Sequence, residues 1–258
     1  MKIALNSIFS GNPSVRSALV AVAVILSGNS ALASPTVIAR YDGFDPNAPI
    51  TIQRTLKDPY LTGPGTDVRN TSPGRFSLTR QGGDFSGTLA GTSPQFFAFC
   101  LEPLEFITPG STTTFDLVDL RFGANNIGGI GVTKADLIRE LFYQQMPDLS
   151  AVISNEKASA LGIAVWEIVR ENPANPLDID AGDAQFDSSS GSGLTVLQLA
   201  RNYLSTVTGT GPRLDNLYAL RNVGVQDLLV QVSSVPEPAT IASFGLGALG
   251  LVLVRRKR

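Results

Sequence analysis

The sequence predicts an α+β fold, a β-rich part that carries an insertion of roughly three helices. Strand-forming segments separated by Gly, Pro and Asn fill the first half of the chain. After Gly131 the apolar period changes from two residues to 3.6, and two strand-like segments return after residue 216. Strands followed by helices and then strands again are typical of an α+β domain rather than of alternating α/β units.

The expected strands combine β-branched and aromatic residues between turn-forming residues. They are residues 35–41, 75–80, 85–89, 96–101 and 113–120, and later 217–220 and 226–232. The stretch 42–73 is polar and carries five prolines, so we expect a long surface loop with one or two short strands.

Three helices are expected between these groups of strands. The first runs over residues 133–145, with Thr133 as its cap and Leu141 facing inward. The second covers residues 155–171, where an apolar stripe ends at Asn172-Pro173, and the third covers residues 194–207.

The composition excludes several classes of function. The chain has 258 residues, 43% of them hydrophobic and 16% charged, which suits a single domain at about residues 34–234 plus appendages. It contains no histidine, which excludes Ser-His-Asp and Cys-His nucleophiles and imidazole metal sites. Residues 34–235 contain 14 basic and 21 acidic side chains, a net charge of −7, so nucleic acid is not an expected partner.

Residues 1–33 are typical of a secretory signal peptide. A basic start precedes an apolar run at residues 18–26, and Ala31 and Ala33 mark a cleavage site before Ser34. The apolar run of nine residues would be about 14 Å long as a helix, too short to cross a bilayer core of about 30 Å. We therefore expect cleavage by signal peptidase, with a retained anchor as the alternative.

Residues 235–258 form a second appendage. The triplet Pro236-Glu237-Pro238 separates the domain from an apolar segment at residues 239–254, which is short for a transmembrane helix but sufficient with local thinning. Four cationic residues favour the cytoplasmic side of the membrane. They are Arg255, Arg256, Lys257 and Arg258. An ordinary tail anchor is the alternative interpretation.

This triplet, apolar helix and basic tail resemble the PEP-CTERM sorting signal of Gram-negative bacteria and cyanobacteria. The resemblance implies that an exosortase in the inner membrane cleaves near the triplet, after transient anchoring there. The protein is then released or re-anchored at the cell surface or in extracellular polymer, so exopolysaccharide is a candidate partner.

The lone Cys100 cannot form an internal disulfide in an exported protein. It lies in the aromatic strand segment Phe97-Ala98-Phe99-Cys100, where a buried, unreactive thiol is the simplest expectation. An intermolecular disulfide is one alternative, and a thioester is another.

The thioester alternative comes from a resemblance. Phe99-Cys100-Leu101 and the later Ala164-Val165-Trp166 resemble the Cys-Gln thioester domains of bacterial surface adhesins, over about residues 96–229. In that family the strand cysteine is joined to a glutamine before an Ala-x-Trp signature, and the resulting acyl group captures an amine. At this position the chain has Leu161 or Gly162, neither of which carries a carboxamide.

The resemblance therefore implies the fold, a β-rich part with a helical insertion, more than the reaction. We expect no thioester unless another glutamine reaches Cys100. The candidates are Gln144, Gln145 and Gln185. Trp166 is expected to be a core aromatic.

Two groups of carboxylates are candidate sites. Four aspartates with a glycine could wrap calcium, although the spacing does not fit an EF-hand and a solvated turn is the simpler interpretation. They are Asp178, Asp180, Asp183 and Asp187. The pairs Glu102 with Glu105 and Glu167 with Glu171 allow a carbohydrate hydrolase, but nothing in the sequence selects them.

We therefore expect an exported, non-catalytic surface or matrix protein without a cofactor, with a covalent adhesin or a carbohydrate-binding protein as alternatives.

Overall fold

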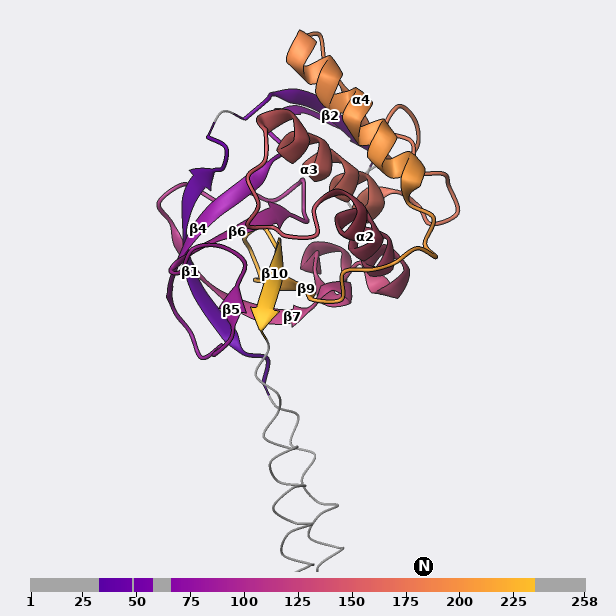
Figure 1. Ribbon diagram of the computed structural model, residues 1–258. Helices are drawn as coiled ribbons and strands as arrows, with labels where there is room; N and C mark the ends of the chain where they lie inside the picture. Colours follow the sequence, from indigo (N-terminus) through magenta and orange to yellow (C-terminus); the bar gives the residue numbers. More distant parts are fainter. Residues whose placement is uncertain (1–32, 48, 58–65, 235–258) are drawn as a thin grey trace, which may run out of the picture. The chain divides into compact units, whose positions relative to one another are not determined.

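The computed structural model describes residues 33–47, 49–57 and 66–234 (Figure 1). The elements below belong to the compact unit that begins at Pro35. The predicted signal peptide, apart from Ala33, and the predicted membrane helix at 239–254 lie outside the described residues. Among the described residues, no helix combines the length and apolar character needed to cross a membrane.

Six antiparallel strands of the described chain close into a barrel, because β9 pairs with both β7 and β10. Their order around the barrel is β10-β6-β4-β1-β7-β9. The bounds are β1 Thr36–Phe44, β4 Arg75–Gly82, β6 Gln95–Cys100, β7 Thr112–Asp119, β9 Leu217–Arg221 and β10 Leu228–Ser234. The two-residue strand β5 (Thr88–Leu89) adds to β10. The strands expected from the sequence are thus confirmed, except that residues 85–87 lie outside β5.

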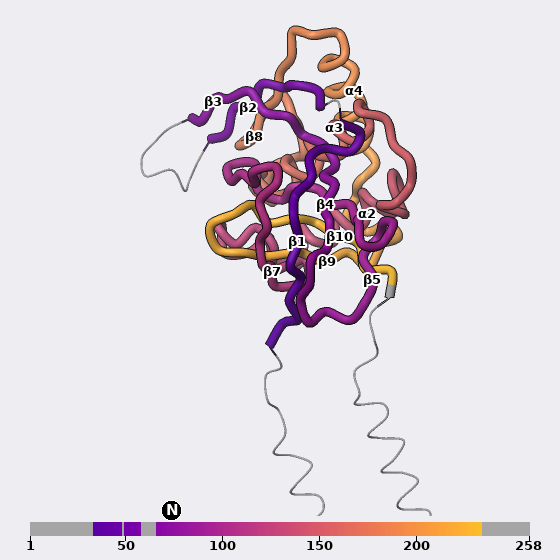
Figure 2. Tube along the Cα trace, turned by 90° about the vertical axis from the view of Figure 1, so that its left-hand side faces the viewer, coloured from indigo at the N-terminus to yellow at the C-terminus, as the bar shows by residue number. Residues whose placement is uncertain are grey.

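Residues 42–73 contain the two short strands that were expected, but these belong to a second sheet of three strands and not to a surface loop. β2 (Ile52–Lys57) lies between β3 (Thr66–Thr71) and β8 (Ala184–Asp187), as Figure 2 shows beside the barrel. Ile52, Arg54 and Leu56 alternate as the buried positions of β2. The buried arginine hides the alternation of apolar and polar residues by which a half-buried strand is recognised.

The helical insertion is confirmed, since α2, α3 and α4 all lie between β7 and β9 in the sequence (Figure 1). Their bounds are α2 Gly131–Gln145, α3 Asn155–Arg170 and α4 Gly191–Thr206, with short 3-10 helices at Leu120–Phe122 (η1) and Asn125–Ile127 (η2). Two of the helices start earlier than predicted. α2 begins before Thr133, and α4 begins at Gly191, where the Ser190 hydroxyl accepts a hydrogen bond from Gly193 N at 3.0 Å and caps the helix.

The central helix α3 is buried on all sides over residues 158–169. It packs against α4 and α2 and also contacts β4, β6 and β8. A Cβ added at Gly162 would lie 3.0 Å from Gly74 N and 3.1 Å from Pro73 Cβ. The absence of a side chain at Gly162 therefore lets α3 approach the segment that leads into β4.

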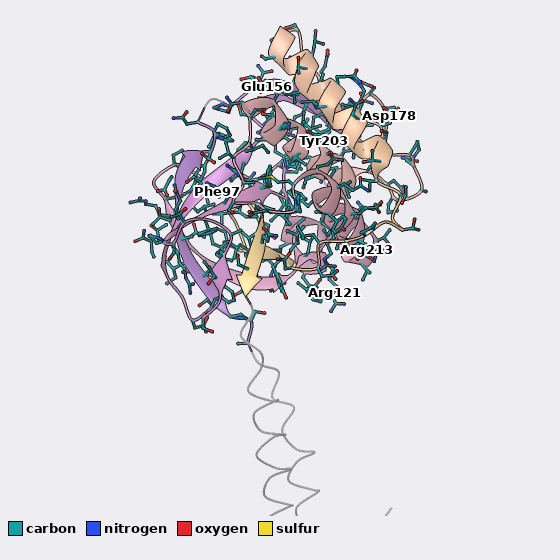
Figure 3. The ribbon with its side chains drawn as sticks, in the orientation of Figure 1. Phe97, Arg121, Glu156, Asp178, Tyr203 and Arg213 are labelled. Atoms are coloured by element: carbon teal, nitrogen blue, oxygen red, sulfur yellow. The ribbon has the colours of Figure 1, made fainter. Side chains whose placement is uncertain are left out.

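Arg75 connects the barrel to the loop after α2. Its side chain is 3% exposed, and Nη1 donates to the carbonyls of Leu149 and Ala151 at 2.8 and 2.7 Å. The guanidinium lies 4.2 Å from the ring centroid of Phe97, which Figure 3 shows among the strands, and pairs with Asp45. Removal of Arg75 would leave these carbonyls unpaired.

Candidate functional site: the Cys100–Gln226 pair

The pairing of β6 with β10 brings Cys100 and Gln226 together. Leu228 lies opposite Cys100, and Leu101 N donates to Asp227 O at 2.9 Å, so the antiparallel ladder continues one step past the strand ends. Gln226 therefore stands diagonally across from Cys100 on the same face, a position from which a long side chain can reach. The two residues are 126 positions apart in the chain.

The Gln226 carboxamide contacts the sulfur directly. Its Nε2 lies 2.5 Å from Cys100 Sγ, closer than the about 2.7–3.2 Å of an N–H···O hydrogen bond even though sulfur is the larger atom. The same nitrogen donates to Glu102 O at 3.1 Å and Glu105 O at 2.9 Å. Because both partners are acceptors, they identify this end of the side chain as the NH2 group and fix the plane of the amide.

Both partners are shielded from water. Cys100 is 2% exposed and Gln226 is 5% exposed. Burial raises the pKa of the Cys100 thiol strongly, and the nearby indole of Trp166 and the backbone of Glu102 oppose this effect only in part. A free thiol at this position would be protonated at neutral pH.

Two buried carboxylates hold the backbone on either side of the pair. Glu102 accepts hydrogen bonds from Asn126 N at 3.0 Å and from Asp227 N at 2.9 Å. Asp227 accepts from Asn222 N at 2.8 Å and from Asn125 N at 2.9 Å. Burial raises the pKa of each carboxyl to about 7, and for Asp227 repulsion by Glu102 adds to the effect. These carboxylates fix the segments that follow Cys100 and flank Gln226.

A pocket of about 410 Å³ opens beside Gln226, and we call it the aromatic pocket. Five aromatic rings line it, together with Gln226 itself: Tyr41, Phe44, Phe76, Phe106 and Trp166. Among the described residues of the lining, Glu105 alone is charged. Phe106 at the pocket is 62% exposed. The pocket is therefore the side from which a small molecule would approach Gln226.

Trp166 lies where α3 meets both the pocket and the sulfur. The predicted core position is confirmed, since the residue is 3% exposed and its ring stacks on Phe186 at 6.4 Å. The indole Nε1 is buried and makes no hydrogen bond of ordinary geometry, yet the indole is close enough to Cys100 to lower the pKa of its thiol. A buried unpaired donor is costly in a native structure.

The glutamines proposed from the sequence lie elsewhere. Gln144 and Gln145 bond to Thr206, and Gln185 donates to the carbonyl of Gly182. Gly162, the position at which the family resemblance placed the glutamine, faces the backbone at residues 73–74. The glutamine beside Cys100 is Gln226, which lies at the start of the strand expected at 226–232 and which no local pattern connects to the cysteine.

The four aspartates do not converge on one point. Asp180 forms an ion pair with Arg201, with oxygen-nitrogen distances of 2.6 and 2.7 Å. Asp178 accepts from Asp180 N, and Asp187 accepts from Ser188 N. Within the described ranges, no group of three or more acidic or cysteine side chains is arranged to hold a metal ion.

The glutamates of the candidate acid–base pairs accept hydrogen bonds from backbone N–H groups, with the exception of Glu105. Glu167 accepts from Asp178 N at 2.8 Å, and Glu171 accepts from Asn172 N at 3.1 Å and Asp183 N at 2.8 Å. Both glutamates are buried. Glu102 is committed to backbone amides as described above, so Glu105 is the one of these four that lines the aromatic pocket.

Comparison with known families identifies the C-terminal appendage. A family profile described as the PEP-CTERM protein-sorting motif matches residues 234–258. The match confirms the sorting signal expected from the sequence and indicates an exported protein that is processed by an exosortase. Comparisons with curated proteins and with solved structures return no significant match.

Proposed function

We propose that the exported body is a thioester domain, in which Cys100 and Gln226 form an internal bond that captures an amine on another molecule. The observation that carries the proposal is the contact of 2.5 Å between Gln226 Nε2 and Cys100 Sγ, at a buried site beside an open pocket. A structural role, in which the glutamine only caps the carbonyls of Glu102 and Glu105, is the alternative.

The geometry supports the formation of the bond. Sγ attacks Cδ of Gln226, the carbon–sulfur bond forms, and the carbon–nitrogen bond breaks. Ammonia leaves with the proton of the thiol, so no oxidant or cofactor is needed. The two carbonyls that bind Nε2 hold the nitrogen that departs, and burial protects the product from hydrolysis.

The same geometry supports the capture of an amine. A primary amine in the aromatic pocket adds to the Gln226 carbonyl carbon, an amide forms, and the sulfur leaves and takes the proton from the amine. A hydroxyl acceptor would require a strong general base, and the chain contains no histidine. Amines need less help because they are nucleophilic without one. Glu105 in the pocket favours a positively charged approach.

The sorting signal gives this reaction a location. Export by signal peptidase and processing by exosortase would present the domain at the cell surface or in extracellular polymer. Covalent capture of amines there would attach the protein to a matrix or to another surface without continuous binding energy. Exopolysaccharide that carries amino groups and exposed lysines of proteins are both acceptors of suitable chemistry.

Intact mass spectrometry of the folded body, residues 34–234, tests the proposal. The wild-type protein should be lighter than its sequence by one ammonia, and Cys100 should resist alkylation after mild unfolding. Methylamine should add one molecule to the protein and release one thiol. A full sequence mass with a Cys100 that alkylates would refute the thioester.

Matched variants locate the bond. Gln226→Ala and Cys100→Ala should each restore the mass expected from the sequence. Gln231→Ala removes a second glutamine of β10 that is 6% exposed, and Gln185→Ala removes one of the glutamines proposed from the sequence. Both controls should keep the ammonia deficit, and a deficit that persists in Gln226→Ala would show that another glutamine is the partner.

A further inference from the structure

We propose that the indole N–H of Trp166 is a catalytic hydrogen-bond donor that stabilises the Cys100 sulfur when it carries negative charge. The inference rests on the proposed thioester and concerns the group that assists its formation and opening. It begins from the unpartnered Nε1, which lies in the interior and belongs to a ring that lines the aromatic pocket.

The position of the indole suits this role. Gln226 and Trp166 both line the pocket, whereas Cys100 is buried behind them and is not part of the lining. An incoming amine therefore approaches Cδ of Gln226 from the pocket, and the sulfur departs toward the interior. A donor for the departing sulfur must lie at this inner side, where water does not reach.

The orientation of the ring is held by its neighbours. Trp166 lies within the buried stretch of α3 and stacks on Phe186 of β8 with an interplanar angle of 21°. Preorganised donors of this kind stabilise charge in a transition state without reorganisation during the reaction. Of the influences that lower the pKa of Cys100, that of Trp166 is the largest, which agrees with an indole N–H close to the sulfur.

Other groups near the sulfur serve this purpose less well. Arg54 on β2 acts on Cys100 through its charge and is ion-paired with Asp67 at 3.3 Å. The negative charge of Glu102 raises the pKa of Cys100 and so disfavours the thiolate. A charged Cys100 in turn raises the pKa of Tyr41. The Glu102 backbone also lowers the pKa of Cys100, so Trp166 is the neutral side-chain donor that assists it when the sulfur gains or loses negative charge.

The chain contains one tryptophan, which permits a test at the level of a single atom. Growth on β-(3-benzothienyl)alanine replaces Trp166 alone and exchanges N–H for sulfur in a ring of almost equal shape. Growth on 5-fluorotryptophan is the control, because it changes the ring and retains the N–H. Circular dichroism and thermal unfolding establish that each protein is folded.

The measured quantity is the rate at which methylamine opens the thioester. A hydrogen bond to a charged group is worth about a ten- to hundredfold change in rate. We expect the benzothienyl protein to react slower by this factor, or to fold without forming the thioester, while the fluorinated protein matches wild type. Equal rates within twofold in all three proteins would overturn the role of Trp166.

A failure of the underlying function gives a different result. If none of the three proteins lacks the mass of one ammonia, the thioester proposal itself is refuted, and the role of Trp166 falls with it. A second readout uses fluorescence, since release of the sulfur beside the only indole should change its emission when methylamine is added. The same addition to Cys100→Ala should leave the emission unchanged.

Discussion

A thioester between Cys100 and Gln226 would act as a cross-link, and its removal should weaken the fold. The bond would close a loop of 126 residues. The chain-entropy relation for cross-links gives about 5 kcal/mol of stabilisation for a loop of this length. At about 2–4 °C per kcal/mol for a body of this size, opening the bond should lower Tm by about 10–20 °C.

The assay compares the same polypeptide before and after reaction with methylamine. Thermal and urea unfolding followed by circular dichroism report the difference in free energy, and intact mass confirms that the bond has opened. Cys100→Ala provides the control. This variant should unfold near the Tm of the methylamine-treated wild type, with a free energy of unfolding lower by a further ~1 kcal/mol for the lost sulfur atom. Methylamine should not change its Tm.

Coincident unfolding curves for untreated and methylamine-treated wild type would refute this reasoning. Such a result would mean either that no cross-link exists or that it lies between segments already held together in the unfolded chain. The accompanying mass measurement separates these cases.

Three further predictions concern other parts of the chain. Burial raises the pKa of Glu167 from 4.5 to about 8, so the native state binds this proton more tightly than the unfolded state, and wild-type stability falls as the pH rises from about 5 to 8. The Tm of Glu167→Gln should therefore rise relative to that of wild type between pH 5 and pH 8. A Tm difference that does not change with pH would contradict the raised pKa. Arg75→Ala should lower the free energy of unfolding by about 3 kcal/mol in urea titrations, because two loop carbonyls lose their partner, and a loss below about 1 kcal/mol would show that water replaces the guanidinium. Terminal mapping of the protein from the producing bacterium should find Ser34 as the first residue and no peptide beyond about residue 238, whereas Arg255 in the surface fraction would argue against exosortase processing.

The sequence predicted the order of the elements well because hydrophobic periodicity dominated most of them. The strands near residues 75–80 and 96–101 and the helix at 155–171 all follow local patterns of apolar residues. Short strands were expected within residues 42–73, but β2 was not located, because Arg54 occupies a buried position in it and is paired with Asp67 of the neighbouring strand. Such a pairing depends on the tertiary fold and leaves no periodic signal.

The sequence predicted two residues of the candidate site, Cys100 and Trp166, but not the glutamine beside the cysteine. Local motifs identify Cys100 and Trp166, but the family resemblance places the glutamine on α3, where Gly162 instead permits close packing. Gln226 depends on the register between β6 and β10, which are far apart in the sequence. One signal was available, namely a polar Gln226-Asp227 step directly before the apolar strand at 228–232, although it identifies no partner by itself.

Peptide mapping tests the central claim most directly. Digestion of the folded protein with pepsin at acid pH, where thioesters survive, should yield one linked species that contains the Cys100 peptide and the Gln226 peptide, lighter than their sum by one ammonia. Hydroxylamine should separate the two peptides. Recovery of both as unlinked peptides, with an intact carboxamide on Gln226 and a free thiol on Cys100, would contradict the account.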